Sequence, residues 1–414
     1  MPDLTCDVVI IGAGTAGIGA ERSARRAGAT TLLIDDRFAG TTCATVGCMP
    51  SKLLIAAAEA ADAVRRAPTF GIKAAGPVID GAAVMQRVRN ERDRFVAGVR
   101  KSFDDLPPGV MLQARARFTA PTRLALDNGR RVTAKAVVIA TGARPSVPPM
   151  FAPVADRVLT NETIFDLADL PASIAVIGAG PLGLELAQAL ARLGVATAVF
   201  DQGNRLAGLR DEAVAGALRA ILARELPIRT GVTLQAEPDE AGARLSWTGA
   251  ETGNACFERL LVAAGRPPQL AGLGLEATGI PLDGHGTPHF DPLTLQCGAA
   301  PIFIAGDANA ARPVLHEASA EGAIAGRNAA SWPDLAPARR NVPFSLVFTD
   351  PPVAVIGAAM DGTEAAVGSA SYDDQGRARI MARNAGLVRI YADRATGRLT
   401  ARPWRGRGLS TART

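Results

Sequence analysis

Residues 7–35 read DVVIIGAGTAGIGAERSARRAGATTLLID, and residues 173–201 follow the same plan with SIAVIGAGPLGLELAQALARLGVATAVFD. Each stretch has a β-branched apolar run, a GxGxxG turn, an amphipathic segment ending at a glycine, a second apolar run and a terminal aspartate. That order is typical of a strand–turn–helix–strand unit that binds a dinucleotide. Two copies at matching offsets predict an α/β chain with two Rossmann-like dinucleotide-binding domains.

The three glycines of each turn are expected to permit, in order, a tight turn, the approach of a pyrophosphate and close packing of helix on strand. They are Gly12, Gly14 and Gly17 in the first copy and Gly178, Gly180 and Gly183 in the second. The helix that follows offers free N–H groups and a positive dipole end to the phosphates. Asp35 and Asp201 are expected to accept hydrogen bonds from ribose hydroxyls. Two such sites imply electron transfer between two cofactors.

The composition fits a protein of two or three domains. The chain has 414 residues, of which 48% are hydrophobic and 21% charged. Its net charge of +5 is spread without a block of like charges, so we expect no nucleic-acid partner. The longest weakly polar stretch, residues 172–184, is shorter than the roughly 18 to 20 apolar residues of a membrane span. The first apolar run begins at Asp7, which leaves no room for a signal peptide and predicts a cytoplasmic protein.

The remaining patterns predict how the domains are nested. A strand at residues 136–140 precedes Thr141-Gly142 and a proline-rich connection, which is typical of a linker into the second unit. A later strand, residues 302–305, leads into Gly306-Asp307 and a helix near Pro313, and we expect it to return the chain to the first domain. The predicted boundaries are 1–145 with 271–335 for the first domain, 146–270 for the second and 340–414 for a third, partial domain of short strands and turns.

Cys43 and Cys48 lie five positions apart in the segment GTTCATVGCMPSK, residues 40–52. In a regular helix the Cα atoms of such a pair are about 8 to 9 Å apart, beyond the roughly 7 Å limit for a disulfide. A bond between them needs a distorted turn, which Gly47 permits, and two unpaired thiols near a helix start are the alternative. Pro50 fits the first turn of a following helix, which places Cys48 at a helix N-terminus, where a thiolate is favoured. Lys52 would add a cation on the same helix face.

The two fingerprints and the cysteine segment together resemble the FAD-dependent pyridine nucleotide–disulfide oxidoreductases, most closely their dihydrolipoyl dehydrogenase branch. The resemblance extends over about residues 5–399. The further shared motifs are Ala140-Thr141-Gly142, Gly183-x-Glu185, Ala264-Gly265-Arg266-x-Pro268, Ala305-Gly306-Asp307, Leu315-His316-Glu317-Ala318 and Phe348-Thr349-Asp350-Pro351-Pro352. The resemblance implies an FAD-binding first domain, an NAD-binding second domain and an incomplete α+β third domain for homodimerisation.

The resemblance also implies roles for individual residues. Cys48 would be the thiol facing the flavin and Cys43 the exposed thiol that exchanges with substrate. Lys52 would lie near the reactive edge of the flavin, paired with Glu185. Beyond the first glycine turn and Asp35, the implied FAD contacts are Thr42, Lys52, Ala116, Thr141, Gly142, Asp307, Leu315 and His316. Beyond the second glycine turn and Asp201, the implied NAD contact is Gly265.

The implied reaction moves electrons between a small-molecule or lipoyl-type dithiol and NAD. A substrate dithiol would attack a Cys43–Cys48 disulfide, the exchange would leave a Cys48 thiolate beside FAD, and a hydride would then pass to NAD+. Asp201 favours NAD because a carboxylate would repel the 2′-phosphate of NADP, although Arg205 would offset part of that repulsion. No metal is expected, because the chain has no CxxC pair and its three histidines lie far from the cysteines in sequence.

The chain departs from the family pattern at three places. Thr41 stands where a glycine is usual, and Ala114-Arg115-Ala116 replaces a Gly-x-Gly. The third is the end of the chain, where the family has a His-Pro…Glu motif that serves the exchange thiol of the other subunit, whereas no histidine follows His316 here. A truncated or frame-shifted end therefore predicts weak dithiol turnover with retained NADH oxidation by artificial acceptors. An NADPH-dependent glutathione-reductase-like enzyme, a mercuric reductase and a catalytically weak flavin-binding remnant are the alternatives.

Overall fold

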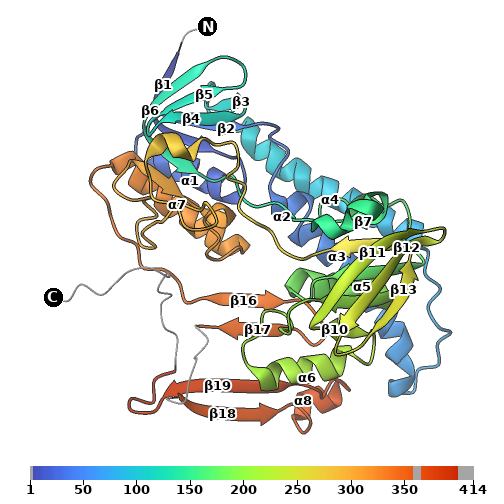
Figure 1. Ribbon diagram of the computed structural model, residues 1–414. Helices are drawn as coiled ribbons and strands as arrows, with labels where there is room; N and C mark the ends of the chain where they lie inside the picture. The colour runs from blue at the N-terminus through green and yellow to red at the C-terminus, as the bar shows by residue number, and fades with distance from the viewer. Residues whose placement is uncertain (1–2, 358–364, 400–414) are drawn as a thin grey trace.

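The first sequence repeat forms β1 (Leu4–Ile11), α1 (Thr15–Arg26) and β2 (Thr31–Asp35) in the computed structural model shown in Figure 1. The structure describes residues 3–357 and 365–399. The run from Val8 to Ile11 is buried, as expected for a parallel strand covered on both faces. The predicted altered end, residues 400–414, lies outside the described residues.

The first sheet joins segments that are far apart in sequence. Its order is β3-β2-β1-β6-β5-β4, and β15 pairs with β6. The added strands are β3 (Met111–Gln113), β4 (Ala116–Ala120), β5 (Arg123–Leu126), β6 (Arg131–Ile139) and β15 (Ile302–Ile304). Because β15 lies parallel to β6, the chain returns to the first sheet after the second unit. The next helix, α7 (Leu315–Ser331), packs against α1 on one face of this sheet.

The second repeat forms a separate parallel sheet. Its strands β8 (Ser173–Ile177) and β9 (Ala196–Asp201) flank α5 (Pro181–Arg192), and the strand order is β10-β9-β8-β14-β7. The remaining strands are β7 (Val158–Leu159), β10 (Ile228–Thr230) and β14 (Arg259–Val262). An antiparallel layer of β11 (Val232–Asp239), β12 (Gly242–Gly249) and β13 (Gly253–Phe257) covers one face of the sheet. Two Rossmann-like units, as predicted, therefore make up most of this α/β chain.

Three helices follow β2 in the chain and precede β3, so they belong to the first unit. They are α2 (Thr42–Thr45), α3 (Cys48–Arg66) and α4 (Gly81–Asp104). Leu54 of α3 and Leu184 of α5 belong to one buried apolar cluster, so the cysteine-bearing helix lies against the helix of the second repeat. The reactive segment is therefore positioned by both units.

The described strands after residue 340 form two separate hairpins. β16 (Phe344–Val347) pairs with β17 (Val353–Ile356), and β18 (Ala365–Ser371) pairs with β19 (Leu387–Asp393). Helix α8 (Gly376–Ile380) lies between the strands of the second hairpin, and α6 (Glu212–Leu222) of the second unit packs against β19. A lone two-stranded hairpin is marginal in water, so burial of Val347 and Val353 against α3 and α5 must hold the first hairpin in place. Within the described residues, no helix has both the length and the apolar character needed to cross a membrane.

Candidate active site

The two glycine turns have the same internal geometry, and each terminal aspartate supports its turn. Asp35 Oδ2 accepts a hydrogen bond from the backbone N–H of Ala13 at 2.9 Å, and Asp201 Oδ2 accepts the equivalent bond from Ala179 at 2.5 Å. A Cβ at Gly17 would lie 1.8 Å from the carbonyl oxygen of the first turn glycine, so only glycine lets helix and strand approach this closely. Both copies therefore form the expected glycine turn, and each aspartate holds its turn through a backbone hydrogen bond.

The first cradle has an unsatisfied polar group. The hydroxyl of Thr141 is buried and has no hydrogen-bond partner among the described residues. Asp307 lies in the short 3₁₀ turn η5 (Gly306–Asn309) after β15, and β15 pairs with β6, the strand that precedes Thr141. Burial raises the pKa of the Asp307 carboxyl group, and the positive charge of Arg266 opposes that shift. A buried polar atom without a partner is costly, and a bound polar ligand removes the cost. These residues therefore fit FAD, whose polar groups would satisfy them.

The turn that carries Asp307 is held by a buried carboxylate. Glu321 of α7 is fully buried, and its Oε2 accepts hydrogen bonds from the backbone N–H of Gly306 and the side-chain amide of Asn309, each at 2.7 Å. Arg340 donates to the other oxygen of Glu321 at 2.5 Å and to Glu317 at 2.7 Å. The same cluster therefore joins the proposed flavin side of the first unit to the segment that leads into β16.

The cysteine segment contains the distorted turn that the five-residue spacing requires. Cys43 lies in the single-turn helix α2, and Cys48 is the first residue of α3. Gly47 separates the two helices, and a Cβ there would lie 2.9 Å from the carbonyl oxygen of Thr42. Thr41, the departure from the family glycine, is the N-cap of α2 and accepts a hydrogen bond from the Ala44 N–H, which explains why this position tolerates threonine.

The two cysteines are free thiols, and each changes the pKa of the other. A hydrogen bond from the Cys43 thiol stabilises the Cys48 thiolate and, together with the positive charge of Lys52, lowers the pKa of Cys48 to about 7 despite its burial. The same hydrogen bond and burial raise the pKa of Cys43. Cys48 therefore ionises near neutral pH, before Cys43 does, and the negative charge of the pair resides on the sulfur of Cys48.

An ion pair lies next to the thiols. Lys52 Nζ is 2.7 Å from Glu185 Oε2, and Glu185 is only 5% exposed. The other carboxylate oxygen, Oε1, accepts a hydrogen bond from the backbone N–H of Phe348 at 2.8 Å. The ring of Phe348 also lies under the Lys52 ammonium, 4.1 Å from ring centroid to Nζ. Phe348 occurs in one of the quoted motifs, but no spacing in the sequence indicates that it lies beside Lys52.

The other predicted contact residues are spread around the first cradle and the second turn. Thr42 is exposed beside Cys43, Ala116 is buried at the start of β4, and Gly142 follows Thr141 after β6. Leu315 and His316 form the exposed first turn of α7, which begins two residues after the expected Pro313. Gly265 follows β14 and is exposed. Buried Asn161 was not predicted from the sequence. Its side-chain amide donates a hydrogen bond to the Val46 carbonyl at 3.0 Å and so stabilises the loop between the cysteines.

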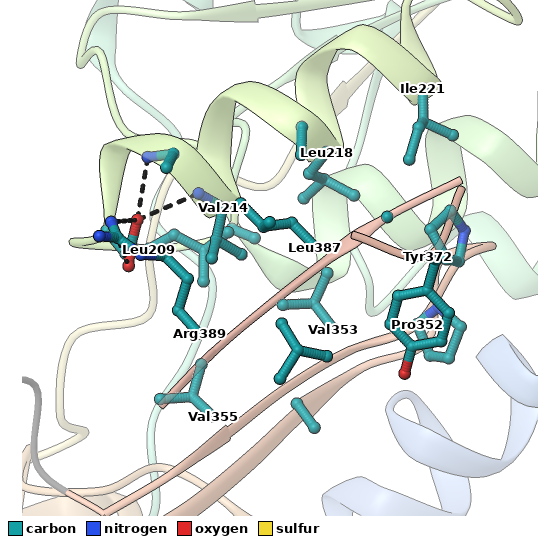
Figure 2. Close-up of a pocket in the computed structure, with 18 of the residues that line it drawn as sticks. Leu209, Val214, Leu218, Ile221, Pro352, Val353, Val355, Tyr372, Leu387 and Arg389 are labelled. Atoms are coloured by element: carbon teal, nitrogen blue, oxygen red, sulfur yellow. Dashed lines mark hydrogen bonds and ion pairs between the residues drawn. The ribbon is translucent and has the colours of Figure 1, made fainter. Parts of the chain in front are cut away.

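A large cavity lies away from the thiols, between α6 and the two C-terminal hairpins (Figure 2). Its volume is about 1410 Å³, and its apolar wall includes Leu209, Val214, Leu218, Val353 and Leu387. At one end Asp211, the N-cap of α6, binds Arg389 at 3.1 Å and the Tyr391 hydroxyl. Neither reactive cysteine nor any GxGxxG glycine lines this cavity, so its size does not mark the reacting centre.

A family model, curated relatives and a solved structure all resemble this chain. The family model described as "Pyridine nucleotide-disulphide oxidoreductase" matches residues 6–323. A dihydrolipoyl dehydrogenase from Bacillus subtilis is 30% identical over 411 residues, covering 95% of this chain and 87% of the relative. A mercuric reductase from Streptomyces lividans is 30% identical over 416 residues, covering 95% of this chain and 85% of the relative. The solved structure of the HOCl-induced flavoprotein disulfide reductase RclA from Escherichia coli has a TM-score of 0.80 at 22% identity, covers 95% of this chain and 88% of its own, and supports the fold.

The family assignment rests on most of the chain and on its motifs together. The matched residues include both glycine turns, the two cysteines and the Lys52–Glu185 pair. Enzymes of this family use FAD and a pyridine nucleotide, which agrees with the two cradles. The chain belongs to the pyridine nucleotide-disulphide oxidoreductases and is a flavoprotein oxidoreductase of the dihydrolipoyl dehydrogenase and mercuric reductase type.

Proposed function

We propose that this enzyme transfers electrons between a small-molecule or lipoyl-type dithiol and NAD(H), using Cys43 and Cys48 as its redox-active pair. The observation that carries the proposal is the thiol pair itself, in which Cys48 has a pKa of about 7 and lies beside the Lys52–Glu185 ion pair. One turnover would oxidise a substrate dithiol to a disulfide and reduce NAD+ to NADH, with release of one proton. Bound FAD would carry the two electrons between the thiol pair and the nicotinamide.

The side chains of the site have separate roles in the proposed reaction. A substrate thiolate attacks the Cys43 sulfur of the Cys43–Cys48 disulfide, which forms the mixed disulfide and releases Cys48 as a thiolate. The second substrate thiol then attacks the mixed disulfide, which closes the substrate disulfide and releases Cys43 as a thiol. Lys52 stabilises the negative charge on Cys48 sulfur, and Glu185 keeps Lys52 in place. The residues proposed to hold FAD are Gly12, Gly14, Gly17, Asp35, Thr42, Lys52, Ala116, Thr141, Gly142, Asp307, Leu315 and His316. Those proposed to hold NAD are Gly178, Gly180, Gly183, Asp201 and Gly265.

Dithiol exchange should be slow compared with NADH oxidation by artificial acceptors. None of the three histidines is hydrogen-bonded to either thiol within the described part of the chain, and a positioned general base usually supplies about 10² to 10⁴-fold. Turnover of lipoamide should therefore lose about that factor and fall well below the NADH:ferricyanide rate, which needs no base at Cys43. Steady-state rates with both acceptors, measured on one flavin-loaded preparation, check this. Comparable rates would show that a base is present after all.

NADH should be the preferred nucleotide. The Asp201 carboxylate stands at the end of β9, where it accepts hydrogen bonds from Ala179 and Gly203. Placing a 2′-phosphate beside a carboxylate costs several kcal/mol, so kcat/KM for NADH should exceed that for NADPH by on the order of 10²-fold. Asp201→Asn should narrow the ratio to about tenfold or less, whereas Arg205→Ala should widen it. Equal efficiencies with the two nucleotides in the unmodified enzyme would support the NADPH-dependent alternative.

We also propose that the protein is a homodimer with FAD-binding residues 1–145 and 271–335, NAD-binding residues 146–270 and an interface domain from residue 340. The two separate Rossmann-like sheets and the return of β15 to the first of them support the first two boundaries. Exposed apolar side chains on the C-terminal hairpins, such as Ile356, Val367 and Ile390, support an interface there. Sedimentation velocity should give twice the monomer mass, and a monomer would contradict the dimer. The cytoplasmic location stays a prediction from the sequence.

A further inference from the structure

The loop between β16 and β17 is docked on the helix that carries Glu185. We call residues 348–350 the strap. The N–H of Phe348 donates to Glu185 Oε1 at 2.8 Å. Asp350 and Gln188 exchange two hydrogen bonds, from Asp350 N–H to Gln188 Oε1 at 2.7 Å and from Gln188 Nε2 to the Asp350 carbonyl at 2.9 Å. Because Glu185 and Gln188 are only 5% and 4% exposed, the strap contacts α5 through buried polar groups.

A third contact fixes the far end of the strap. Arg192, one further turn along α5, pairs with Asp350 Oδ2 at 3.0 Å and makes a two-point pair with Glu225 at 2.7 and 2.8 Å. Arg65 of α3 donates to the Arg192 carbonyl at 2.6 Å. Buried Val347 and Val353 flank the strap on either side. The strap is therefore held against α5, which is itself bonded to α3, and this fixes its position relative to Lys52.

Lys52 is held between two groups that belong to different elements. Its ammonium is 2.7 Å from Glu185 on one side and 4.1 Å from the centroid of the Phe348 ring on the other. One carboxylate oxygen of Glu185 therefore accepts a hydrogen bond from Lys52, and the other accepts one from the backbone of the strap. An aromatic face attracts an ammonium and shields it from water, so the ring both orients the charge and reduces its screening.

We propose that Phe348 is a positioning residue: it holds the Lys52 ammonium between its ring and Glu185 so that the charge acts on the Cys48 thiolate. The C-terminal hairpin thereby takes part in the redox site through the strap. The inference takes from the proposed function only that Cys48 is the reactive thiolate. Its test uses neither flavin turnover nor substrate, so it can fail independently.

Three titratable groups act on Cys48. They are Cys43 from α2, Lys52 from its own helix α3 and Glu185 from α5. Cys43 and Lys52 lower the pKa of Cys48, whereas Glu185 raises it. Loss of the Phe348 ring would leave Lys52 hydrated and mobile while Glu185 stays in place, so the net effect on Cys48 is a higher pKa, toward the ordinary value of about 8.5.

Thiol alkylation gives the direct test. The rate of Cys48 carbamidomethylation by iodoacetamide would be followed from pH 5 to pH 10 by peptide mass spectrometry in the reduced full-length protein. Phe348→Leu should raise the midpoint, which lowers the Cys48 rate at pH 6 about threefold to tenfold. Phe348→Tyr keeps an aromatic face and should leave the midpoint at the unmodified value. If Phe348→Leu does not fold, Phe348→Met keeps the apolar volume without the ring and should give the same shift.

Phe344→Leu is the matched control, since Phe344 lies on the same hairpin and is 42% exposed, as Phe348 is. Its ring faces His316 at 6.0 Å, so the Cys48 midpoint should not change. An unchanged midpoint in Phe348→Leu, or an equal shift in Phe348→Tyr or Phe344→Leu, would overturn the inference. The expected midpoints in a protein that shows no NADH-dependent turnover would contradict the proposed function and leave the inference standing.

Discussion

Cys43→Ser is expected to abolish dithiol–disulfide turnover while leaving the NADH:ferricyanide rate within about twofold of the unmodified enzyme. A serine hydroxyl cannot form a mixed disulfide, so the covalent route through Cys43 is lost. Enzymes commonly accelerate their reactions by about 10⁶-fold or more, and loss of the covalent partner should remove at least about 10³ of that. The measurement is lipoamide and ferricyanide turnover on matched, flavin-loaded preparations.

Cys256→Ser serves as the control for Cys43→Ser, because Cys256 lies in β13 and hydrogen-bonds to Asp239 rather than to the redox pair. It should leave both rates unchanged. Persistent lipoamide turnover in Cys43→Ser would mean that another group exchanges with substrate. Equal loss of both activities would mean that the substitution had damaged the flavin site instead.

Arg340→Met is expected to destabilise the protein by about 3 to 5 kcal/mol. Arg340 is 11% exposed and bonds to both Glu317 and Glu321, which are almost fully buried. Removing Arg340 leaves the buried carboxylates of Glu317 and Glu321 without enough positive charge to compensate them. Loss of one partner from a buried ion network is strongly destabilising. Thermal unfolding should shift down by roughly 6 °C or more, at about 2 to 4 °C per kcal/mol.

The neighbouring Arg339 offers a matched control. Arg339 is exposed and makes no hydrogen bond or ion pair with the described residues, so Arg339→Met should change stability by less than about 0.5 kcal/mol. Adding Glu321→Gln to Arg340→Met should recover part of the loss, because one uncompensated buried charge is removed. Equal unfolding temperatures for Arg340→Met and Arg339→Met would show that the buried network does not stabilise the fold.

The same cluster predicts a pH dependence of stability. Burial raises the pKa of Glu317, but hydrogen bonds from Arg340 and Arg312 outweigh burial and lower it overall. A carboxyl group whose pKa is lower in the folded state stabilises the fold above its unfolded pKa of about 4.3 and loses that contribution as the pH falls. The contribution of Glu317 should therefore be lost in urea unfolding between pH 7 and pH 3, and Glu317→Gln should flatten that part of the profile. Glu321 acts in the opposite direction, because burial raises the pKa of its carboxyl group.

Features set by local sequence could be predicted well. The glycine turns, the aspartates that end the second strands and the break at Gly47 depend on residues within about thirty positions of one another. Their backbone requirements can therefore be deduced without knowing the rest of the fold. Gly47 and Pro50 likewise predict that Cys48 lies at the start of a helix. Lys52 is then one turn further along that helix and close to Cys48.

Features that depend on distant segments could not be predicted from pattern alone. Phe348 lies beside Lys52 because the hairpin between β16 and β17 docks on α5, and nothing in the spacing of these residues indicates that contact. The sequence does not distinguish Arg340 from the other arginines, and only the fold shows that it bonds to Glu317 and Glu321. The resemblance implied a third α+β domain, but it did not show that the described strands form two separate hairpins.

Anaerobic titration of the purified flavin-loaded protein with NADH tests the central claim most directly, because it reports a Cys48 thiolate against the flavin. We expect a long-wavelength absorbance band to grow with added NADH, to fade as the pH falls below about 7, and to be absent in Cys48→Ser. A band of equal strength in Cys48→Ser, or a purified protein that binds no flavin under any loading condition, would contradict the account.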